Sequence, residues 1–332
     1  MEETYKRRSN ETLADYKERL YKNRKNYGLT WEKVAELLGK KQNPDHLRKT
    51  NYGYLERIAD EKMLNKFDKN IMIINDIHVP FERTDVLEII AKHKEEIDTL
   101  VIGGDFMDCE SISSFPKVKN RNLLDEIIYA REFLKKIRNI LNNNQKIIII
   151  NGNHEERLHK MISKMHEKDL QKFINPNVID MLVEGFTIYD NGRKIKYNGI
   201  DNVIYIPHWY VQVDRIIVSH PKNFSIAKGK MLENVTSHFM NKNLDFDVVV
   251  FGHTHKASSG LIDRFSNKIA VENPCLCKPQ SYADTGKTNF TQQAYGYTII
   301  KYNKNEKVSY NNIKTYILDE IKDEIKEYKI VL

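Results

Sequence analysis

One feature constrains the fold of this chain more than any other. It is a set of short apolar runs, each followed directly by residues whose side chains can bind a metal. Five such runs, rich in isoleucine and valine, occur at residues 71–74, 100–102, 147–150, 216–218 and 248–251. Short, continuous, β-branched runs are typical of strands that are buried on both faces. The sequence therefore predicts an α/β domain, and the carboxyl ends of such strands are where α/β sheets place their ligands.

The residues that follow the five runs share one chemistry, because all of them carry carboxylate, imidazole or amide side chains. They are Asp76, His78, Asp105, Asp108, Asn153, His154, His220, His253 and His255. Mixed oxygen and imidazole donors suit Mn²⁺, Fe or Zn²⁺, whereas oxygen donors alone favour Mg²⁺ or Ca²⁺. Two such cations roughly 3.5–4 Å apart acidify a shared water and neutralise phosphoryl oxygens. We therefore expect two divalent metal ions, Mn²⁺ above all, with Fe, Zn²⁺ and Ni²⁺ as alternatives.

The order D-x-H, G-D-x-x-D, G-N-H-E, H and G-H-x-H resembles the signature of the calcineurin-like metallophosphoesterase superfamily, over about residues 71–302. One such piece arises by chance in many proteins, but five pieces in the right order, each after an expected strand, do not. The resemblance implies an α/β fold in which a two-sheet sandwich is flanked by helices. It also implies a phosphoesterase that uses a metal-bridging hydroxide.

The resemblance further implies a role for each matching residue. The first metal would be held by Asp76, His78 and His255, the second by Asn153, His220 and His253, and Asp105 would bridge the two. The catalytic pair would be His154, which donates a proton to the leaving group, and Asp108, which orients it.

Two further residues are candidates for contacts with the substrate. Arg157 follows the G-N-H-E turn and can offer a bidentate donor to a phosphate oxygen, although a solvated position fits equally well. His208 lies in the segment between the third and fourth motifs, where a substrate wall could form, but a structural role is favoured. Four histidines in helical, charge-rich segments are interpreted as surface or packing residues: His93, His159, His166 and His238.

The N-terminal segment, residues 1–69, is predicted to be basic and helical. Residues 1–70 contain seventeen Lys and Arg against twelve Asp and Glu, so they carry +5 of the formal net charge of +7. Thr30 and Gly39 have the positions of helix caps, and Asn43 with Pro44 can open a second helix carrying Arg48 and Lys49. The pair resembles a helix-turn-helix, which predicts nucleic-acid binding through Arg48 and Lys49. A solvated surface, or a helical pair that packs on the body or docks a protein, explains the same pattern.

The rest of the chain is predicted to be a catalytic domain, residues 70–310, and a C-terminal helical tail, residues 311–332. Helices are expected at residues 82–94, 122–141 and 155–168, and shorter strands of a second sheet at 186–218 and 268–302. In the tail, apolar residues at helical spacing favour packing on the body, with a homo-oligomer contact as the alternative: Leu318, Ile321, Ile325 and Tyr328.

Composition sets the outer limits. The chain has no long apolar stretch for a membrane span, and its charged start is not a secretory signal, so a cytoplasmic protein without membrane contact is expected. Cys109, Cys275 and Cys277 are too few and too poorly spaced for a disulfide framework, which agrees with a reducing compartment.

These features favour a phosphodiesterase, above all a nuclease acting on DNA or RNA. Protein phosphatases of the superfamily have an arginine directly after the residue that corresponds to Asp108, and here Cys109 and Glu110 follow instead. Glu155 does resemble that branch, so a phosphomonoesterase or protein phosphatase stays an alternative, as does a phosphodiesterase of cyclic nucleotides or other small molecules. From another class, the chain could be a DNA-binding regulator.

Overall fold

The computed structural model describes residues 5–319 apart from 9–10, 25, 40–66, 115–120, 165–168, 170–174, 226, 228, 264–266 and 280–292. The chain divides into two compact units, Met1–Phe67 and Asp68–Leu332. Each unit has a hydrophobic core of its own.

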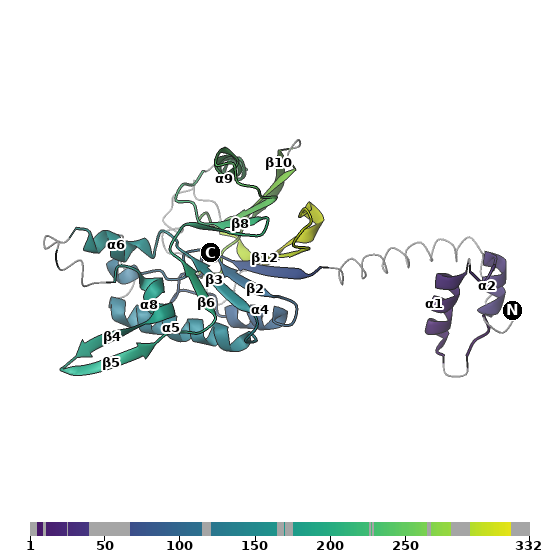
Figure 1. Ribbon diagram of the computed structural model, residues 1–332, viewed down its shortest axis with the longest axis horizontal. Helices are drawn as coiled ribbons and strands as arrows, with labels where there is room; N and C mark the ends of the chain where they lie inside the picture. Colours follow the sequence, from purple (N-terminus) through teal and green to yellow (C-terminus); the bar gives the residue numbers. More distant parts are fainter. Residues whose placement is uncertain are drawn as a thin grey trace, which may run out of the picture. The chain divides into compact units, whose positions relative to one another are not determined.

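The N-terminal unit contains two short helices, α1 (Leu13–Asn23) and α2 (Trp31–Leu37) (Figure 1). The side chain of Thr30 caps α2, because it accepts a hydrogen bond from the N–H of Lys33 at 3.3 Å. Apolar side chains from both helices and the loop between them form the core of the unit: Tyr16, Leu20, Tyr21, Leu29, Val34, Ala35 and Leu38. The expected second helix of the helix-turn-helix, with Arg48 and Lys49, lies outside the described residues.

The larger unit is built on a six-stranded sheet with the strand order β13-β12-β1-β2-β3-β6. The central strands β1, β2, β3 and β6 are parallel, and β12 and β13 are antiparallel to their neighbours. The strands are β1 (Lys69–Ile74), β2 (Thr99–Ile102), β3 (Lys146–Ile150), β6 (Val203–Ile206), β12 (Tyr295–Tyr302) and β13 (Ile313–Leu318).

A second sheet of five strands has the order β10-β11-β9-β8-β7. Its strands are β7 (Tyr210–Val213), β8 (Ile216–Ser219), β9 (Val248–Phe251), β10 (Ser258–Asp263) and β11 (Lys268–Glu272). The inner strands β8, β9 and β11 are parallel, and β7 and β10 close the two edges in antiparallel pairing.

The two sheets face each other, and side chains alternate between the two sides of each strand. Along β1, Ile71 and Ile73 belong to the cluster between the sheets, whereas Met72 and Ile74 belong to the cluster under the helices. The helices α4 (Val86–His93), α5 (Leu123–Ile140) and α8 (Val178–Glu184) cover the first sheet, and α9 (Lys230–Asn241) covers the second (Figure 1). The predicted two-sheet sandwich flanked by helices is therefore confirmed.

The assignment of strands to sheets differs in part from expectation. Not all of residues 186–218 and 268–302 join the second sheet, since β6 and β12 belong to the first. In addition, β4 (Gly185–Asp190) and β5 (Arg193–Asn198) pair with each other and, within the described part of the chain, with no other strand, so they form a separate ribbon. The physical reason is that side-chain periodicity indicates a strand but not its partner.

The helical tail expected at residues 311–332 is wrong for its first part. Residues 310–312 form the short 3-10 helix η4 (Tyr310–Asn312), and β13 follows it and pairs with β12. The aromatic ring of Tyr316 stacks on that of Tyr297 with centroids 4.8 Å apart, which is a cross-strand contact rather than a helical one. The catalytic fold thus extends beyond residue 310 to Leu318, and residues 320–332 lie outside the described part of the chain.

The helices are shorter at their ends than the sequence predicts. Helix α4 begins at Val86 rather than at residue 82, because Glu82 forms a β-bridge with Cys277. The described part of the helix expected at 155–168 is α6 (Glu156–Ile162). Among the described residues, the structure contains no helix with the length and apolarity that crossing a membrane requires.

Candidate metal centre

The candidate site lies where the parallel strands of both sheets end. The loops after β1, β2 and β3 come from the first sheet, and those after β8 and β9 come from the second. Because the sheets face each other, the five loops meet at one edge of the sandwich and bring together the seven predicted metal-binding residues. They form overlapping groups of donor atoms: Asp76, His78 and Asp105, then Asp105, His220 and His253, with His255 beside His78 and Asn153 beside His220.

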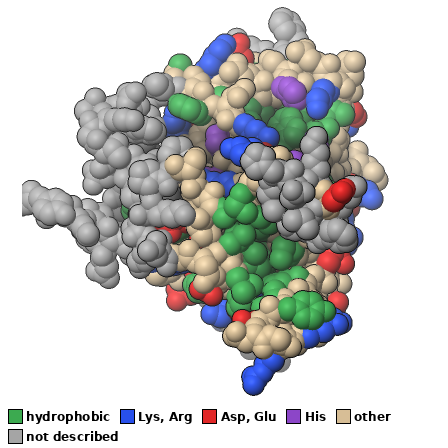
Figure 2. Space-filling model, turned by 90° about the vertical axis from the view of Figure 1, so that its left-hand side faces the viewer, with side chains coloured by type: hydrophobic (Ala, Val, Ile, Leu, Met, Phe, Trp, Pro, Cys, Tyr) green, Lys and Arg blue, Asp and Glu red, His purple; other side chains and the backbone are tan. Residues whose placement is uncertain are grey.

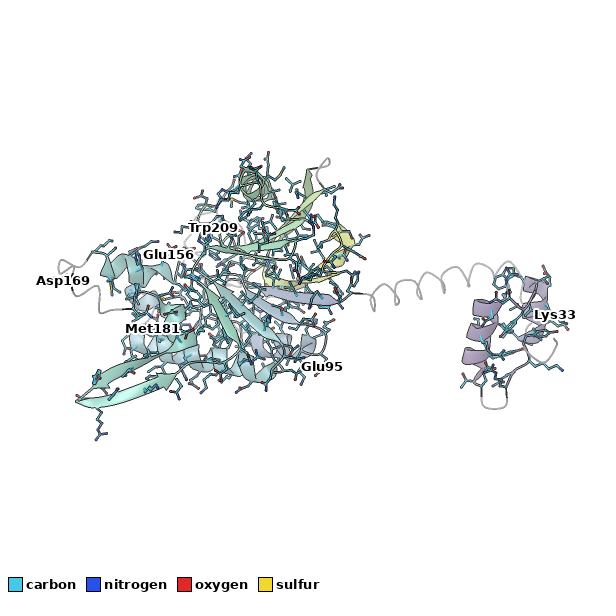
Figure 3. All side chains as sticks on the ribbon, in the orientation of Figure 1. Lys33, Glu95, Glu156, Asp169, Met181 and Trp209 are labelled. Atoms are coloured by element: carbon cyan, nitrogen blue, oxygen red, sulfur yellow. The ribbon has the colours of Figure 1, made fainter. Side chains whose placement is uncertain are left out.

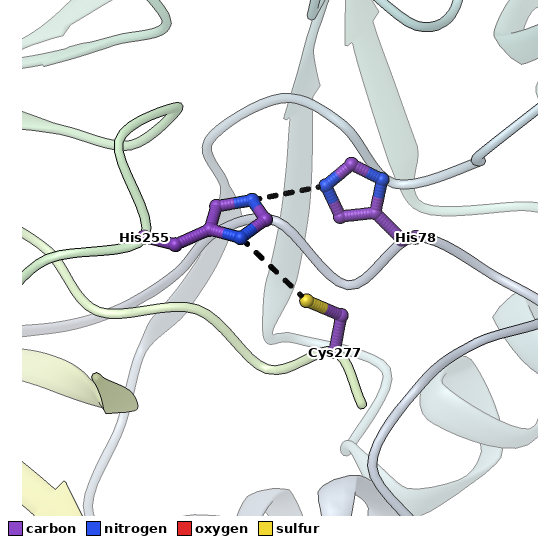
Figure 4. Close-up of side chains that lie close together, drawn as sticks. All are labelled: His78, His255 and Cys277. Carbon is purple, nitrogen blue, oxygen red and sulfur yellow. Dashed lines mark hydrogen bonds between the residues drawn. The ribbon is translucent and has the colours of Figure 1, made fainter. Parts of the chain in front are cut away.

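Asp76, His78 and His255 form the first group of donors. Nε2 of His78 lies 3.2 Å from Nε2 of His255 (Figure 4), and Nε2 of His255 lies 3.3 Å from Oδ1 of Asp76. Nδ1 of His78 lies 3.0 Å from Oδ1 of Asp108. Burial acts to raise the pKa of Asp108, but hydrogen bonds from His154 and His78 hold it well below its usual range. The carboxylate is therefore ionised and can only accept, so His78 carries its proton on Nδ1 and turns a lone pair on Nε2 into the centre.

Asp105, Asn153, His220 and His253 form the second group. Nε2 of His220 lies 3.1 Å from Oδ2 of Asp105 and 3.2 Å from Oδ1 of Asn153. Nδ1 of His220 donates to the carbonyl oxygen of Gly103 at 3.0 Å, so Nε2 is the nitrogen that faces these two oxygens. Burial and the neighbouring His220 lower the pKa of His253 to about 4, which keeps its ring neutral and free to bind a metal.

Asp105 belongs to both groups and lies between them. Its Oδ2 atom is 3.1 Å from Nε2 of His220 and 3.8 Å from Nε2 of His78, and its Oδ1 atom accepts the backbone N–H of His154 at 3.0 Å. Burial lowers the pKa of His220, but the charge and hydrogen bond of Asp105 outweigh it and raise that pKa to about 10. The negative charge of Asp105 therefore requires a positive charge beside it, which is either a proton on His220 or a bound metal ion. Carboxylate, imidazole and amide donors that converge in this way fit two divalent cations with Asp105 as the shared ligand.

The outer nitrogen of His255 is also held. The side-chain amide of Gln293 lies 2.6 Å from Nδ1 of His255, and Sγ of the buried Cys277 lies 3.9 Å from it (Figure 4). No sequence motif includes either residue, and only the chain path after β11 brings them to the ring. Such contacts fix the orientation of a ligating imidazole.

A buried polar network behind the centre was not expected from the sequence. Nδ2 of Asn75 donates to the carbonyl oxygen of Gly103 at 2.8 Å, and its Oδ1 accepts from Nδ2 of Asn273 at 2.6 Å. Thr298 donates in turn to Oδ1 of Asn273 at 2.7 Å. All three side chains are fully buried. The network ties the loops after β1, β2 and β11 to β12, and the position of Asn75 directly before Asp76 is the signal that could have indicated it.

Glu155 clasps two of the ligand loops together. Its Oε1 accepts the N–H of Met107, and its Oε2 accepts the N–H of Gly152, each at 2.9 Å. Burial, and after it the charge of Asp105, raises the pKa of Glu155 to about 7. The side chain is 2 % exposed, and its two hydrogen bonds position the loops.

The predicted catalytic pair lies beside the first group. Nδ1 of His154 is 3.1 Å from Oδ1 of Asp108 and 2.9 Å from the carbonyl oxygen of Asp108. Arg157 does not extend into solvent: its Nη1 donates to the same carbonyl oxygen at 2.6 Å, and its Nη2 lies 3.1 Å from Nε2 of His154. Asp108 thus contacts both His78 and His154, and Arg157 covers the free nitrogen of His154.

His208 lies apart from the donor groups. Its exposed ring packs against Tyr210 with centroids 4.7 Å apart, and its carbonyl oxygen accepts the N–H of Asn151 at 3.0 Å. The residue therefore joins β6 to the end of β3 through its backbone. Of the other histidines, His93 packs in the core with Nε2 at 2.7 Å from the hydroxyl of Tyr297.

A cavity of about 390 Å³ lies beside α6 and the end of β3, and the candidate metal ligands are not among its lining residues. Glu156, which lines it, lies on α6 at the left-hand side of the molecule (Figure 3). Most of its lining side chains are polar: Asn151, Glu155, Glu156, His159, Pro176, Asn177 and Lys222. Its volume falls in the range of about 300–1,000 Å³ that is typical of small-molecule sites.

The backbone at the centre adopts a conformation that side chains other than glycine rarely take. Five of the seven candidate ligands have a positive φ: Asp76 (51°), His78 (52°), Asp105 (49°), His253 (80°) and His255 (54°). Left-handed residues of this kind cost free energy and gather at functional sites, where the surrounding structure holds them.

Residues 69–257 match the sequence profile of the calcineurin-like phosphoesterase family, and residues 1–49 match that of the YonJ N-terminal domain. No curated protein sequence matched the chain.

Several solved structures are similar to the chain at low sequence identity. The zinc complex of Vps29 from Entamoeba histolytica is 12% identical, with a TM-score of 0.35 over 75% of this chain and 98% of that one. A metallophosphoesterase from Sphaerobacter thermophilus is 11% identical, with a TM-score of 0.37 over 77% and 91% of the two chains. A predicted phosphoesterase from Streptococcus pneumoniae is 12% identical, with a TM-score of 0.30 over 75% and 98%.

Proposed function

We propose that this chain, which belongs to the calcineurin-like phosphoesterase family, cleaves phosphodiesters and that its substrate is nucleic acid. Its family is binuclear and metal-dependent, so the chain is a metal-dependent phosphoesterase, a hydrolase of ester bonds. The observation that carries the proposal is the shared position of Asp105 between two groups of donor atoms. Two bound cations would supply Lewis-acid stabilisation of the phosphoryl oxygens and an acidified water.

The proposed ligand sets follow from the donor atoms that converge. Asp76, His78 and His255 would hold one cation, and Asn153, His220 and His253 the other, with Asp105 contributing to both. Four imidazoles in the set favour Mn²⁺, Fe, Zn²⁺ or Ni²⁺ over Mg²⁺, and the carboxylate and amide oxygens favour Mn²⁺ among them.

We propose that His154 protonates the leaving oxygen. The carboxylate and carbonyl oxygens of Asp108 both lie near Nδ1 of His154, so the protein holds the proton on Nδ1, and the proton given to the leaving oxygen would come from Nε2 of the imidazolium. Nη2 of Arg157 lies 3.1 Å from this Nε2. An oxygen of the substrate that approaches Nε2 would therefore also meet the guanidinium of Arg157, which can stabilise its charge.

The residue after Asp108 supports a diester over a monoester as the substrate. Cys109 stands where protein phosphatases of the superfamily carry an arginine, and its side chain is fully buried. The arginine that clamps a phosphomonoester in that branch therefore has no counterpart at position 109.

The charge of the N-terminal segment supports nucleic acid as the diester. Residues 1–70 carry +5 of the formal net charge of +7, so most of the excess positive charge precedes the catalytic unit. Contacts between basic residues and phosphates supply most non-specific affinity for nucleic acid. In this proposal the N-terminal segment holds the strand while the catalytic unit cleaves it.

The cavity beside α6 favours a second candidate, a small-molecule phosphodiesterase. Its volume of about 390 Å³ and its polar lining suit a compact ligand such as a cyclic nucleotide.

One substrate panel tests these proposals. Wild-type protein loaded with Mn²⁺ is assayed on bis-nitrophenyl and mono-nitrophenyl phosphate, single- and double-stranded DNA, RNA, cyclic nucleotides and a phosphopeptide. We expect the diester to be hydrolysed faster than the monoester and a nucleic acid to be cleaved. A preference for the monoester or the phosphopeptide would contradict the phosphodiesterase, and turnover confined to cyclic nucleotides would favour the second candidate.

A further inference from the structure

The two-stranded ribbon of β4 and β5 projects from the catalytic unit on the same side as α6, the helix that follows the His154 loop (Figure 1). Asp190 pairs with Arg193 across the turn, so Asn191 and Gly192 are the two turn residues, both with positive φ. This is the turn that matches the twist of two antiparallel strands. Among the described residues, the ribbon pairs with no other strand.

One face of the ribbon is attached to the body. Phe186 packs against the core under the helices, and its ring stacks on that of Tyr197 with centroids 4.6 Å apart. Arg131 on α5 lies over the ring of Tyr197 at 5.8 Å and donates to the carbonyl oxygen of Asn198. The base of the ribbon is thereby anchored, which fixes the direction of its opposite face.

The opposite face carries an exposed aromatic ring beside two lysines. Tyr189 pairs directly with Lys194, and Thr187 pairs with Lys196, so all four side chains lie on one face. Tyr189 is 76 % exposed, and both lysines are exposed. Among the described residues, neither lysine has an ion-pair partner and Tyr189 has no hydrogen bond. The two lysines are ~6.8 Å apart along the strand, comparable to the spacing of successive phosphates on an extended strand.

We propose that this face of the ribbon binds an unpaired stretch of the nucleic-acid substrate, with Tyr189 stacking on a base and Lys194 and Lys196 contacting phosphates. Exposed aromatic rings interleaved with cations are how proteins hold single strands without reading their sequence. The inference rests on the proposed function, because it deepens the same activity by naming how the strand is held.

The place of the ribbon suits this role. Seen from the side of the ribbon and α6, histidine side chains lie in the upper half of the molecular face, with Lys and Arg side chains at its lower end, where the ribbon lies (Figure 2). Apolar side chains occupy the surface between them. Met181 on α8 lies between Glu156 and the ribbon in the other view (Figure 3). The ribbon and α6, the helix that follows the His154 loop, thus lie on the same side of the catalytic unit (Figure 1).

The test compares two double variants of the full-length protein that remove the same charge at different places. Lys194→Ala with Lys196→Ala removes it from the ribbon. Lys304→Ala with Lys307→Ala removes it from the exposed loop after β12, at the opposite end of the sheet from the ligand loops. Binding of fluorescein-labelled oligo(dT) is followed by anisotropy over a series of NaCl concentrations, with EDTA present to prevent cleavage.

We expect the ribbon variant to bind more weakly and its salt slope to fall by about 1.4, since each phosphate contact with a single strand contributes about 0.7. The loop variant should keep the wild-type slope. Equal slopes for the ribbon variant and wild type would overturn the inference, and so would the same reduction in both variants. As a control for folding, each variant should hydrolyse bis-nitrophenyl phosphate with Mn²⁺ at the wild-type rate.

Tyr189→Ala tests the stacking. We expect on the order of tenfold weaker binding of oligo(dT) and a smaller loss for a duplex, whose bases are not free to stack. Tyr189→Trp should retain binding. Equal losses of affinity for oligo(dT) and for the duplex would contradict stacking of Tyr189 on an unpaired base. If the wild type neither binds nor cleaves nucleic acid, the proposed function fails as well, whereas a cleaving enzyme with unaffected ribbon variants rejects the ribbon alone.

Discussion

Gly152→Ala should inactivate the enzyme while leaving it folded, because the added methyl group has no room. A Cβ at position 152 would lie 2.1 Å from Oδ1 and 2.3 Å from the backbone N of Asp105, and 2.7 Å from Oε2 of Glu155. To restore an ordinary contact of 3.4 Å, Oδ1 of Asp105 must move about 1.3 Å away from the loop that follows β3 and carries Gly152. A misplacement of about 1 Å at a reacting centre can cost about 10²-fold in rate.

The same overlap costs about 1–3 kcal/mol of stability, as overpacking usually does, against about 5–15 kcal/mol for a typical fold. Turnover of bis-nitrophenyl phosphate, metal content per chain and the thermal midpoint are measured together. Gly260→Ala is the matched control, because its Cβ would meet only Leu232, at 4.0 Å. Turnover and metal content at the wild-type level in Gly152→Ala would refute the close approach of the two loops and with it the shared role of Asp105.

Three other predictions concern the shared metal ligand, the proposed acid and the N-terminal segment. Asp105→Asn should lose metal and activity together, whereas His93→Ala should lower the thermal midpoint and keep both metals; two tightly bound metals in Asp105→Asn would reject the assignment. His154→Ala should lose about 10²–10⁴-fold on an alkyl or nucleic-acid ester but far less on a nitrophenyl ester, whose leaving group needs no proton; equal losses on both would exclude His154 as the acid. A chain that begins at Asp68 should keep turnover of bis-nitrophenyl phosphate but bind DNA with a shallower salt dependence, and an unchanged slope would exclude the N-terminal segment as a DNA-binding element.

The strands and the positions of the candidate ligands could be predicted because each depends on residues that are close together in the sequence. A buried parallel strand requires a continuous apolar run, and a ligand at its end requires a polar residue directly after it. Residues 147–150 followed by Asn153 and His154 are one such unit. The structure brings all seven candidates to one edge of the sandwich, as the resemblance implied.

The supporting contacts could not be predicted, because they join residues that are far apart in the chain. Asn75 and Asn273 meet only because β1 and β11 end near each other, and Gln293 reaches His255 only through the path of the chain after β11. The same limit explains β13, where the alternation from Ile313 to Leu318 is short and competes with a helical pattern of apolar residues that follows it. The ribbon had a local signal, since Asn191 and Gly192 between two apolar, aromatic segments favour a hairpin.

The left-handed backbone at the ligand positions implies that residues needed for catalysis lower the stability of the fold. His253 has a φ of 80°, a conformation that costs an ordinary residue on the order of 1–3 kcal/mol and costs glycine almost nothing. With the metals removed from both proteins, His253→Gly should therefore melt at a higher temperature than the wild type, and it should lose activity when metal is supplied. In a descendant that no longer needs activity, glycine or asparagine could replace the ligands at these positions. Such substitutions would then mark the loss of activity while the fold stays the same.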